Sequence, residues 1–250
     1  MTICVVNAVK TPSSLVVANF GPRGNALTAK TPHKLLVDYM DTTPESNRFQ
    51  LQEATHLVHF ATRHVPRRDI SFTENWSQWI IGQCYSPMLQ TQDTDLLIAG
   101  RLGNCADRCQ ILKSIAERSG KRCRFVGLSG HVVLEVEVDG KWNIADPDYN
   151  VTYPMEVQEL ARPQNETLMH NSLRLWYTPT VVDQYIQIVQ STENNLQMPT
   201  GSPLSPRLYL AEQICKWLSW LVPVLLLFSV VPWLRSDKMQ FHASPKSMLP

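Results

Sequence analysis

Three residues that could together carry out acyl chemistry follow one another along the chain: Cys105, His131 and Asp146. Asn104 is a suitable N-cap and Gly120 a suitable stop for a helix between them, which places Cys105 in the first helical turn. The helix dipole and the free N–H groups at that turn favour the thiolate, the nucleophilic form of cysteine. A thiolate that attacks an amide needs a base, which then protonates the leaving group, and a third group that orients the base.

The segment after this helix predicts a β-hairpin that brings the other two residues together. Apolar residues alternate over 132–138, Asp139-Gly140 is typical of a two-residue turn, and the return strand ends at Asp146. In that register His131 opposes Asp148. His131 and Asp146 are then diagonal neighbours on one face of the hairpin, with backbones about 7–8 Å apart, a gap their side chains can bridge.

The remaining elements are expected to support the hairpin. Thr43-Pro44 is typical of a helix start, and apolar residues recur at helical spacing from Ala54 to Val65. A second helix is predicted over Trp76–Gln83 and a strand over 122–128. Residues 1–43 are expected to form a strand or two and loops.

Three sequence blocks carry a family resemblance. In order, the chain reads GNCAD over Gly103–Asp107, GHVVLEV over Gly130–Val136 and DGKWNIADP over Asp139–Pro147. These blocks resemble the core of the transglutaminase-like superfamily, whose pattern has a cysteine at a helix start, a histidine opening a strand and an Asp-Pro ending the next strand. The resemblance extends over about residues 45–180 and is specific across 100–150.

The resemblance implies an α+β, papain-like fold, with N-terminal helices packed on an antiparallel sheet. It also implies a triad in which Cys105 is the nucleophile, His131 the general base and acid, and Asp146 the orienting residue. Ala106 and Val133 depart from the residues often found after the Cys and two places after the His, which could reshape the acyl pocket. An upstream aromatic or amide side chain commonly assists the oxyanion in this superfamily; the candidates are Trp76, Trp79 and Gln83.

Two other clusters in the sequence have residue types found in metal or redox sites. His56, His59 and His64 share a predicted helix, yet no carboxylate or cysteine nearby completes a ligand set. Cys84, Cys105, Cys109 and Cys123 could form a zinc site, but no Cys-x-x-Cys pair occurs among them. Cys109 could also act as a resolving thiol for an oxidised Cys105. No cofactor and no metal are therefore expected. The basic residues Arg63, Arg67 and Arg68 form either a solvated face or a contact for acidic lipid or substrate.

Near the C-terminus lies the clearest targeting feature. Residues 217–234 carry no charge, and starting at Ile214 gives a run that would span roughly 31 Å as a helix, the thickness of a bilayer core. Trp217 and Trp233 lie near its ends, as interfacial anchors do. The N-terminus lacks the pattern of a cleaved signal peptide, so a cytoplasmic N-terminal domain with a C-terminal single-pass anchor is expected.

Composition sets the outer limits. The chain has 250 residues and a net charge of +1, so it has no basic field that would favour nucleic acid as a partner. Its six cysteines are too few for a disulfide scaffold. The expected organisation is an N-terminal extension (1–44), a transglutaminase-like domain (45–190), a flexible linker (191–213), a transmembrane helix (214–234) and a short tail (235–250).

Two functions remain open. The first is a membrane-anchored thiol enzyme that acts on a peptide or protein amide, by hydrolysis as a protease or amidase or by acyl transfer to an amine as a transglutaminase; hydrolysis is favoured because no feature visibly excludes water. The alternative is a non-catalytic binding or assembly module tethered to a membrane biosynthetic system. Lipid is a partner of the C-terminal helix in either case, and the oligomeric state stays open.

Overall fold

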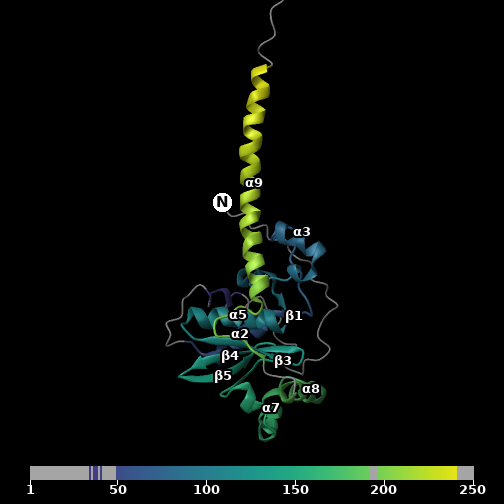
Figure 1. Cartoon of the computed structure of the whole chain (residues 1–250). Helices are drawn as coiled ribbons and strands as arrows, with labels where there is room; N and C mark the ends of the chain where they lie inside the picture. Colours follow the sequence, from purple (N-terminus) through teal and green to yellow (C-terminus); the bar gives the residue numbers. More distant parts are fainter. Residues whose placement is uncertain (1–33, 35, 39, 41–48, 192–195, 241–250) are drawn as a thin grey trace, which may run out of the picture. The chain divides into compact units, whose positions relative to one another are not determined.

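The computed structural model of the chain describes residues 34, 36–38, 40, 49–191 and 196–240, with side chains as far as Ser229. It divides into two compact units (Figure 1). The first, here called the sheet unit, takes in the described residues up to Asp69 and those from Gln90 to Pro206. The second, here called the helical unit, consists of Ile70–Leu89 and the described residues from Arg207 onward.

An antiparallel sheet of five strands forms the centre of the sheet unit. Its order is β6-β5-β4-β3-β7. The predicted hairpin is present as β4 and β5, and Val138 pairs with Lys141, as expected. Asp139 and Gly140 both have positive φ, 53° and 75°, as the right-handed twist of a two-residue hairpin requires. The strands are β3 (Cys123–Leu128), β4 (His131–Val138), β5 (Lys141–Asp146), β6 (Val151–Tyr153) and β7 (Leu196–Gln197).

Helices cover both faces of this sheet (Figure 1). On one face α2 and α5 pack against Phe125, Leu134 and Val136. On the other, α7 and α8 pack against Val126, Val133 and Ile144. Successive side chains of β4 therefore point into two different apolar cores, one on each face of the sheet, and neither face is open to solvent. The helices of the sheet unit are α2 (Leu51–Ala61), α4 (Thr94–Gly100), α5 (Cys105–Arg118), α6 (Val157–Leu160), α7 (Glu166–Leu173) and α8 (Pro179–Gln190), with the short turn η3 (Pro163–Asn165).

A buried ion pair joins the sheet to the helices of the second face. Glu135 on β4 is fully buried, and its carboxylate accepts hydrogen bonds from Arg124 Nε at 2.6 Å and from the backbone N–H of Val157 at 2.8 Å. The Val157 N–H belongs to the first turn of α6 and has no acceptor within its own helix. Glu135 therefore fixes where the chain leaves the sheet towards α7 and α8.

The helical unit contains α3 (Trp76–Cys84), the short turn η2 (Ser86–Leu89) and the long helix α9 (Pro206–Gln240). α3 is capped by Asn75, whose side chain accepts from the Gln78 N–H. Residues Pro206–Ser229 of α9 are long and apolar enough to cross a membrane, and only 11% of their apolar window is buried in the structure. The fold is therefore a mixture of helices and antiparallel sheet with one C-terminal apolar helix.

Several expectations differ from the structure. The helix predicted up to Val65 ends at Ala61, and Arg63–His64 instead form β1, which pairs in parallel with β2 (Leu102–Gly103). The expected linker contains β7, which pairs with β3, and α9 begins at Pro206, before the predicted span. Residues 34, 36–38 and 40 are helical where strands and loops were expected, whereas the predicted helix start at Thr43 lies outside the described residues.

The hairpin turn can be tested directly. Replacing Gly140 by Ala should lower the free energy of unfolding by about 1 kcal/mol, because an L side chain is strained at this positive φ. A Cβ at this position meets no atom within 4 Å, so the loss reports backbone strain alone. Asp139→Asn serves as a control, since Asn tolerates positive φ, and chemical denaturation should show no change for it. Equal losses in both variants would contradict this reading of the turn.

Candidate active site

Cys105 is the first residue of α5, where the sequence predicts it. Asn104 caps the helix with a reciprocal capping box: its side chain accepts from the Asp107 N–H, and the Asp107 carboxylate accepts from the Asn104 N–H, both at 3.0 Å. These two bonds fix the direction in which the chain enters the helix. Cys105 is half-buried and belongs to no disulfide, so its sulfur is positioned by a rigid turn and is still accessible.

His131 and Asp146 meet as the hairpin register predicts. The His131 Nε2–H donates to Asp146 Oδ2 over 2.7 Å, and both side chains are buried, at 6% and 0% exposure. Asp146 Oδ1 accepts two more hydrogen bonds, from the backbone N–H groups of Asp148 at 2.9 Å and Tyr149 at 3.2 Å. Because Asp146 engages Nε2, Nδ1 is the ring nitrogen of His131 that remains for another partner.

The electrostatic surroundings favour the protonated form of His131. Burial opposes protonation of the ring, but the charge and hydrogen bond of Asp146 outweigh it. The Cys105 side chain acts in the same direction, through hydrogen bonding and charge, and the pKa of His131 lies well above its usual value. A sulfur, an imidazole and a carboxylate drawn from α5, β4 and β5 thus interact in series.

Aromatic rings enclose the imidazole on the side of α8. His131 makes edge-on contacts with Tyr149 and Tyr185, with ring centroids 5.4 Å and 6.4 Å away. Tyr185 is fully buried, and the two tyrosines also contact each other. Burial raises the pKa of both phenols well beyond their usual value, so both remain neutral at physiological pH. The rings therefore restrict the orientation of His131 without adding charge.

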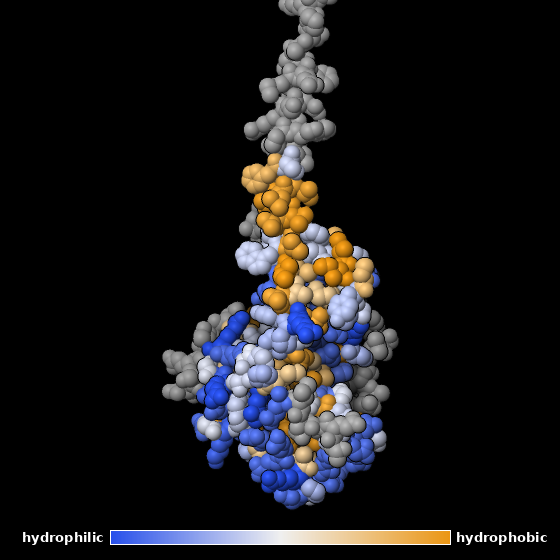
Figure 2. All heavy atoms as spheres, viewed as in Figure 1, coloured by the Kyte–Doolittle hydropathy of each residue, from blue (hydrophilic) through white to orange (hydrophobic). Residues whose placement is uncertain are grey.

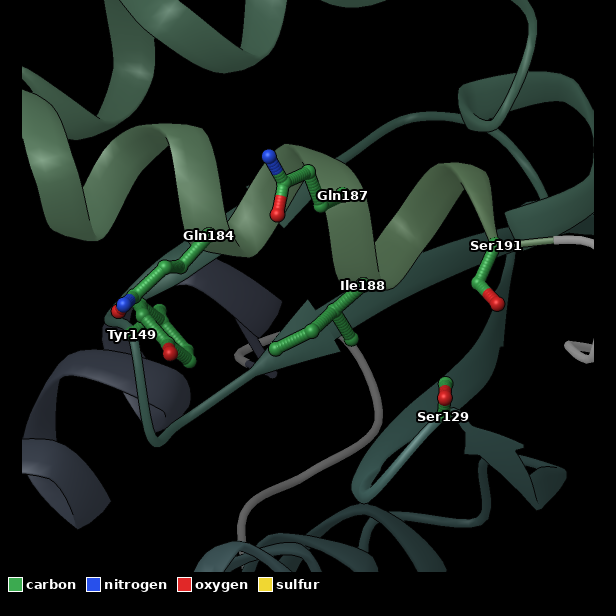
Figure 3. Close-up of a pocket in the computed structure, with 6 residues that line it drawn as sticks. All are labelled: Ser129, Tyr149, Gln184, Gln187, Ile188 and Ser191. Atoms are coloured by element: carbon green, nitrogen blue, oxygen red, sulfur yellow. The ribbon is translucent and has the colours of Figure 1, made fainter.

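An open groove borders this site (Figure 3). Its lining consists of Ser129, Tyr149, Gln184, Gln187, Ile188 and Ser191. Figure 3 shows Gln184 extending to Tyr149 at one end and Ser129 and Ser191 at the other, with Ile188 between them. Tyr149 contacts both this groove and His131, so its ring lies between the groove and the imidazole. None of its lining residues is charged.

A second polar cluster holds the loop that follows Asp146. Arg108, 1% exposed on the inner face of α5, pairs with Asp148 Oδ1 at 3.0 Å and donates to the Thr62 carbonyl at 2.8 Å. His64 donates to the same Asp148 oxygen at 2.7 Å. Burial alone would raise the pKa of Asp148, but the His64 hydrogen bond and the Arg108 charge outweigh it and lower that pKa. Arg108, His64 and Asp148 are here called the Arg108 clamp. The clamp holds the loop whose two N–H groups donate hydrogen bonds to Asp146.

The three histidines considered as metal ligands have other roles. His59 is buried and donates to the Pro147 carbonyl at 3.0 Å, and His56 contacts the Asn150 side chain at 3.1 Å. His64 lies on β1, not on the helix with the other two. Among the described residues no group of three or more metal-ligating side chains is assembled. The three rings instead hold the loop over residues 147–150.

The residues predicted to assist the oxyanion belong to a different unit from the triad. Trp76, Trp79 and Gln83, the candidates for assisting the oxyanion, belong to α3 in the helical unit. There the Trp76 indole donates to the Ser219 carbonyl at 3.3 Å, and Gln83 donates to the Trp79 carbonyl at 3.2 Å. The side chains of Trp76 and Gln83 are therefore hydrogen-bonded within the helical unit. The structure identifies none of the three candidates as the oxyanion donor.

The remaining cysteines are readily distinguished from Cys105. Cys109 is fully buried, its thiol donates to the Val132 carbonyl at 3.4 Å, and burial raises its pKa well above the usual range. Cys123 is buried, and burial raises its pKa to about 12. Cys84, on the helical unit, is exposed. Of the described cysteines in the sheet unit, Cys105 alone combines accessibility with a histidine neighbour.

Sequence reasoning missed the residues of the Arg108 clamp and the aromatic enclosure. A signal for the clamp exists, because Arg108 lies at helical spacing with Cys105 and Leu112, on an apolar face of α5 where an arginine requires a buried partner. The register also places Asp148 opposite His131, but the hairpin alone does not indicate that Asp148 pairs with Arg108 on α5. No pattern in the sequence indicates that Tyr185, from α8, reaches the imidazole.

No protein-family model, curated protein or solved structure matches this chain. The site is therefore interpreted from its own geometry and from the residues that compose it.

The Arg108 clamp makes a prediction about stability. Replacing Arg108 by Met should reduce the free energy of unfolding by about 3 kcal/mol, because the buried Asp148 carboxylate loses its charge partner. Arg122→Met is the matched control: Arg122 also pairs with a carboxylate, that of Glu137, but its side chain is 66% exposed, so the loss should stay below about 1 kcal/mol. Similar losses in chemical denaturation would contradict a structural role for the clamp.

His59 predicts a dependence on acid. Burial, followed by the neighbouring Arg108 charge, lowers the pKa of His59 from 6.5 to about 3. Between these values the unfolded chain binds a proton that the folded chain does not, so the free energy of unfolding should fall as the pH falls through that window. His59→Gln keeps an N–H donor for Pro147 and removes the titration. Its stability should decline less with acid than that of the unmodified chain; parallel pH profiles would contradict the assignment.

Proposed function

We propose that this protein is a membrane-anchored thiol acyl enzyme of the transglutaminase-like kind, with Cys105 as nucleophile, His131 as general acid and base, and Asp146 as the residue that orients the imidazole. The observation that carries the proposal is the position of His131, whose ring interacts with Asp146 through Nε2 and with the Cys105 side chain. The order of helix start, strand start and strand end also agrees with the sequence pattern of that superfamily, as expected for a papain-like core.

The proposed first step is acylation. The Cys105 thiolate attacks the carbonyl carbon of an amide, and the carbonyl oxygen takes the negative charge of the tetrahedral intermediate. The Cys105 N–H, in the first turn of α5, lacks an acceptor within the helix and can face that oxygen. Collapse breaks the C–N bond, the protonated His131 gives its proton to the leaving amine, and a thioester on Cys105 remains.

Deacylation regenerates the enzyme. His131, now neutral, takes a proton from water as the water oxygen attacks the thioester carbonyl. The C–S bond breaks, a carboxylic acid leaves, and the thiolate and imidazolium return. An amine in place of water would give a new amide, the transglutaminase outcome. Hydrolysis is favoured because Cys105 is partly exposed and no feature of the described residues visibly excludes water.

The proposal includes a membrane anchor. Along α9 the apolar side chains face outward, with Trp217 76%, Trp220 73% and Phe228 73% exposed. Such exposure is unfavourable in water and expected in lipid. Arg235 and Lys238 follow the apolar run and end it. We therefore propose that the C-terminal helix crosses the bilayer.

The test of the triad is selective labelling with a thiol-directed electrophile. At neutral pH Cys105 should react at least about tenfold faster than Cys84, an exposed cysteine without a histidine partner, since the imidazole of His131 can accept the proton of the attacking thiol. His131→Gln should reduce the Cys105 rate to that of Cys84, and Asp146→Asn should reduce it in part. The rates are read by mass spectrometry of each peptide after timed quenching.

Controls separate loss of chemistry from loss of fold. Circular dichroism should show that His131→Gln keeps its helix and sheet content, and Cys84 labelling should keep its rate. If Cys105 and Cys84 react at equal rates in the unmodified chain, the enzyme proposal fails. The sheet unit would then be better described as a binding or assembly module, the alternative that the sequence left open.

A further inference from the structure

The helical unit exposes apolar side chains away from its long helix. On and beside α3, Phe72 is 53% exposed, Ile80 49%, Ile81 41% and Tyr85 57%. Figure 2 shows this apolar surface as a separate patch in addition to the apolar length of α9. Large apolar residues exposed together on and beside one short helix mark a surface that binds either protein or lipid.

The sequence around α3 supports a lipid environment. From Asn75 to Gln92 the chain contains no Asp, Glu, Lys, Arg or His, and charged residues return at Glu74 and Asp93 on either side. Trp76 and Trp79 lie within this charge-free segment, and Phe72 contacts Trp79 edge-on with centroids 5.5 Å apart. Tryptophan and tyrosine prefer the membrane–water boundary, where the ring is buried and its polar atom is hydrated.

Hydrogen bonds connect α3 to α9 at residues 215–219 of the long helix. Ser77 Oγ donates to the Cys215 carbonyl at 2.7 Å, and Ser219 Oγ donates to Asn75 Oδ1 at 2.9 Å. The Trp76 indole donates to the Ser219 carbonyl. Lys216 is the last charged residue before the apolar run, so these contacts lie at the beginning of the stretch assigned to the membrane.

We infer that α3 is an interfacial membrane helix, which lies at the boundary between phospholipid headgroups and acyl chains with Ile80, Ile81 and Tyr85 in the lipid. The inference rests on the proposed anchoring role of α9. Ser219 lies five residues after Ile214, about 7.5 Å into a span of roughly 31 Å, so a partner bonded to Ser219 lies nearer one surface of the bilayer than its centre. The capping bonds of Asn75 and the contacts with α9 satisfy the polar groups of α3 in that position.

Depth-sensitive fluorescence in vesicles tests the inference. The full chain, carrying Cys4→Ser, Cys84→Ser and Cys105→Ala, receives one cysteine in turn by Ile81→Cys, Leu225→Cys or Lys141→Cys, and each is labelled with a polarity-sensitive fluorophore. The native Cys109, Cys123 and Cys215 are buried and should not react. Each protein is reconstituted into phosphatidylcholine vesicles with or without lipid that carries a nitroxide on the acyl chain, near the headgroup for the reporter at 81, near the methyl end for the reporter at 225, and in both positions for the reporter at 141.

The reporter at 81 should shift to the blue and lose most of its fluorescence to the nitroxide lipid. The reporter at 225 should also be quenched because it lies within α9, whereas the reporter at 141, at the exposed hairpin of the sheet unit, should not respond. Quenching at 225 without quenching at 81 would overturn the inference and leave the anchor in place. Failure at 225 would overturn the anchor itself, and with it the role of α3.

Charge substitutions provide the matched comparison. Ile80→Asp should reduce the quenching at 81 and leave that at 225 unchanged, because a carboxylate resists the acyl region. Leu175→Asp, at a similarly exposed apolar residue of the sheet unit, should change neither signal. A blue-shifted reporter at 81 that does not respond to nitroxide lipid would overturn the inference as well, since it would mean that protein and not lipid covers α3.

Discussion

The buried carboxylate of Asp146 is the constraint on which the sheet unit's site depends. A carboxylate with no exposed surface is costly unless each oxygen is satisfied, and here one oxygen accepts from His131 while the other accepts from two backbone N–H groups. Those N–H groups belong to the loop after β5, so the loop, the imidazole and the end of the strand must be correct together. The Arg108 clamp holds the same loop through the side chain of Asp148.

Arg108 connects the loop to the nucleophile, because it lies on the same helix as Cys105. One turn of α5 presents the sulfur, and the side chain three residues later grips the loop that positions the carboxylate. Movement of α5 would therefore shift the sulfur and the loop in the same direction. The spacing between nucleophile and base is preserved by this shared attachment, in addition to the packing of α5 on β4.

The parts of the site that are local in sequence were predictable. The capping box at Asn104 and the turn at Asp139-Gly140 are set by neighbouring residues, and the hairpin register follows from the turn. What could not be predicted depends on contacts between distant segments. β7 has two residues and gains its conformation from pairing with β3, and α8 covers His131 only because the chain returns beneath the sheet. The histidines near residue 60 have the residue types of a metal site, yet their partners lie on the loop after β5.

Cys109 sets a limit on how the site can respond to oxidation. It follows Cys105 by one helical turn, but its thiol is fully buried, bonded to the Val132 carbonyl, and strongly disfavoured as a thiolate. It is thus unsuited to attack a sulfenic acid formed on Cys105 while α5 and β4 remain packed. Recovery after a peroxide pulse would consequently require a small thiol or reductase from outside, and the protein's redox state would follow that of its surroundings.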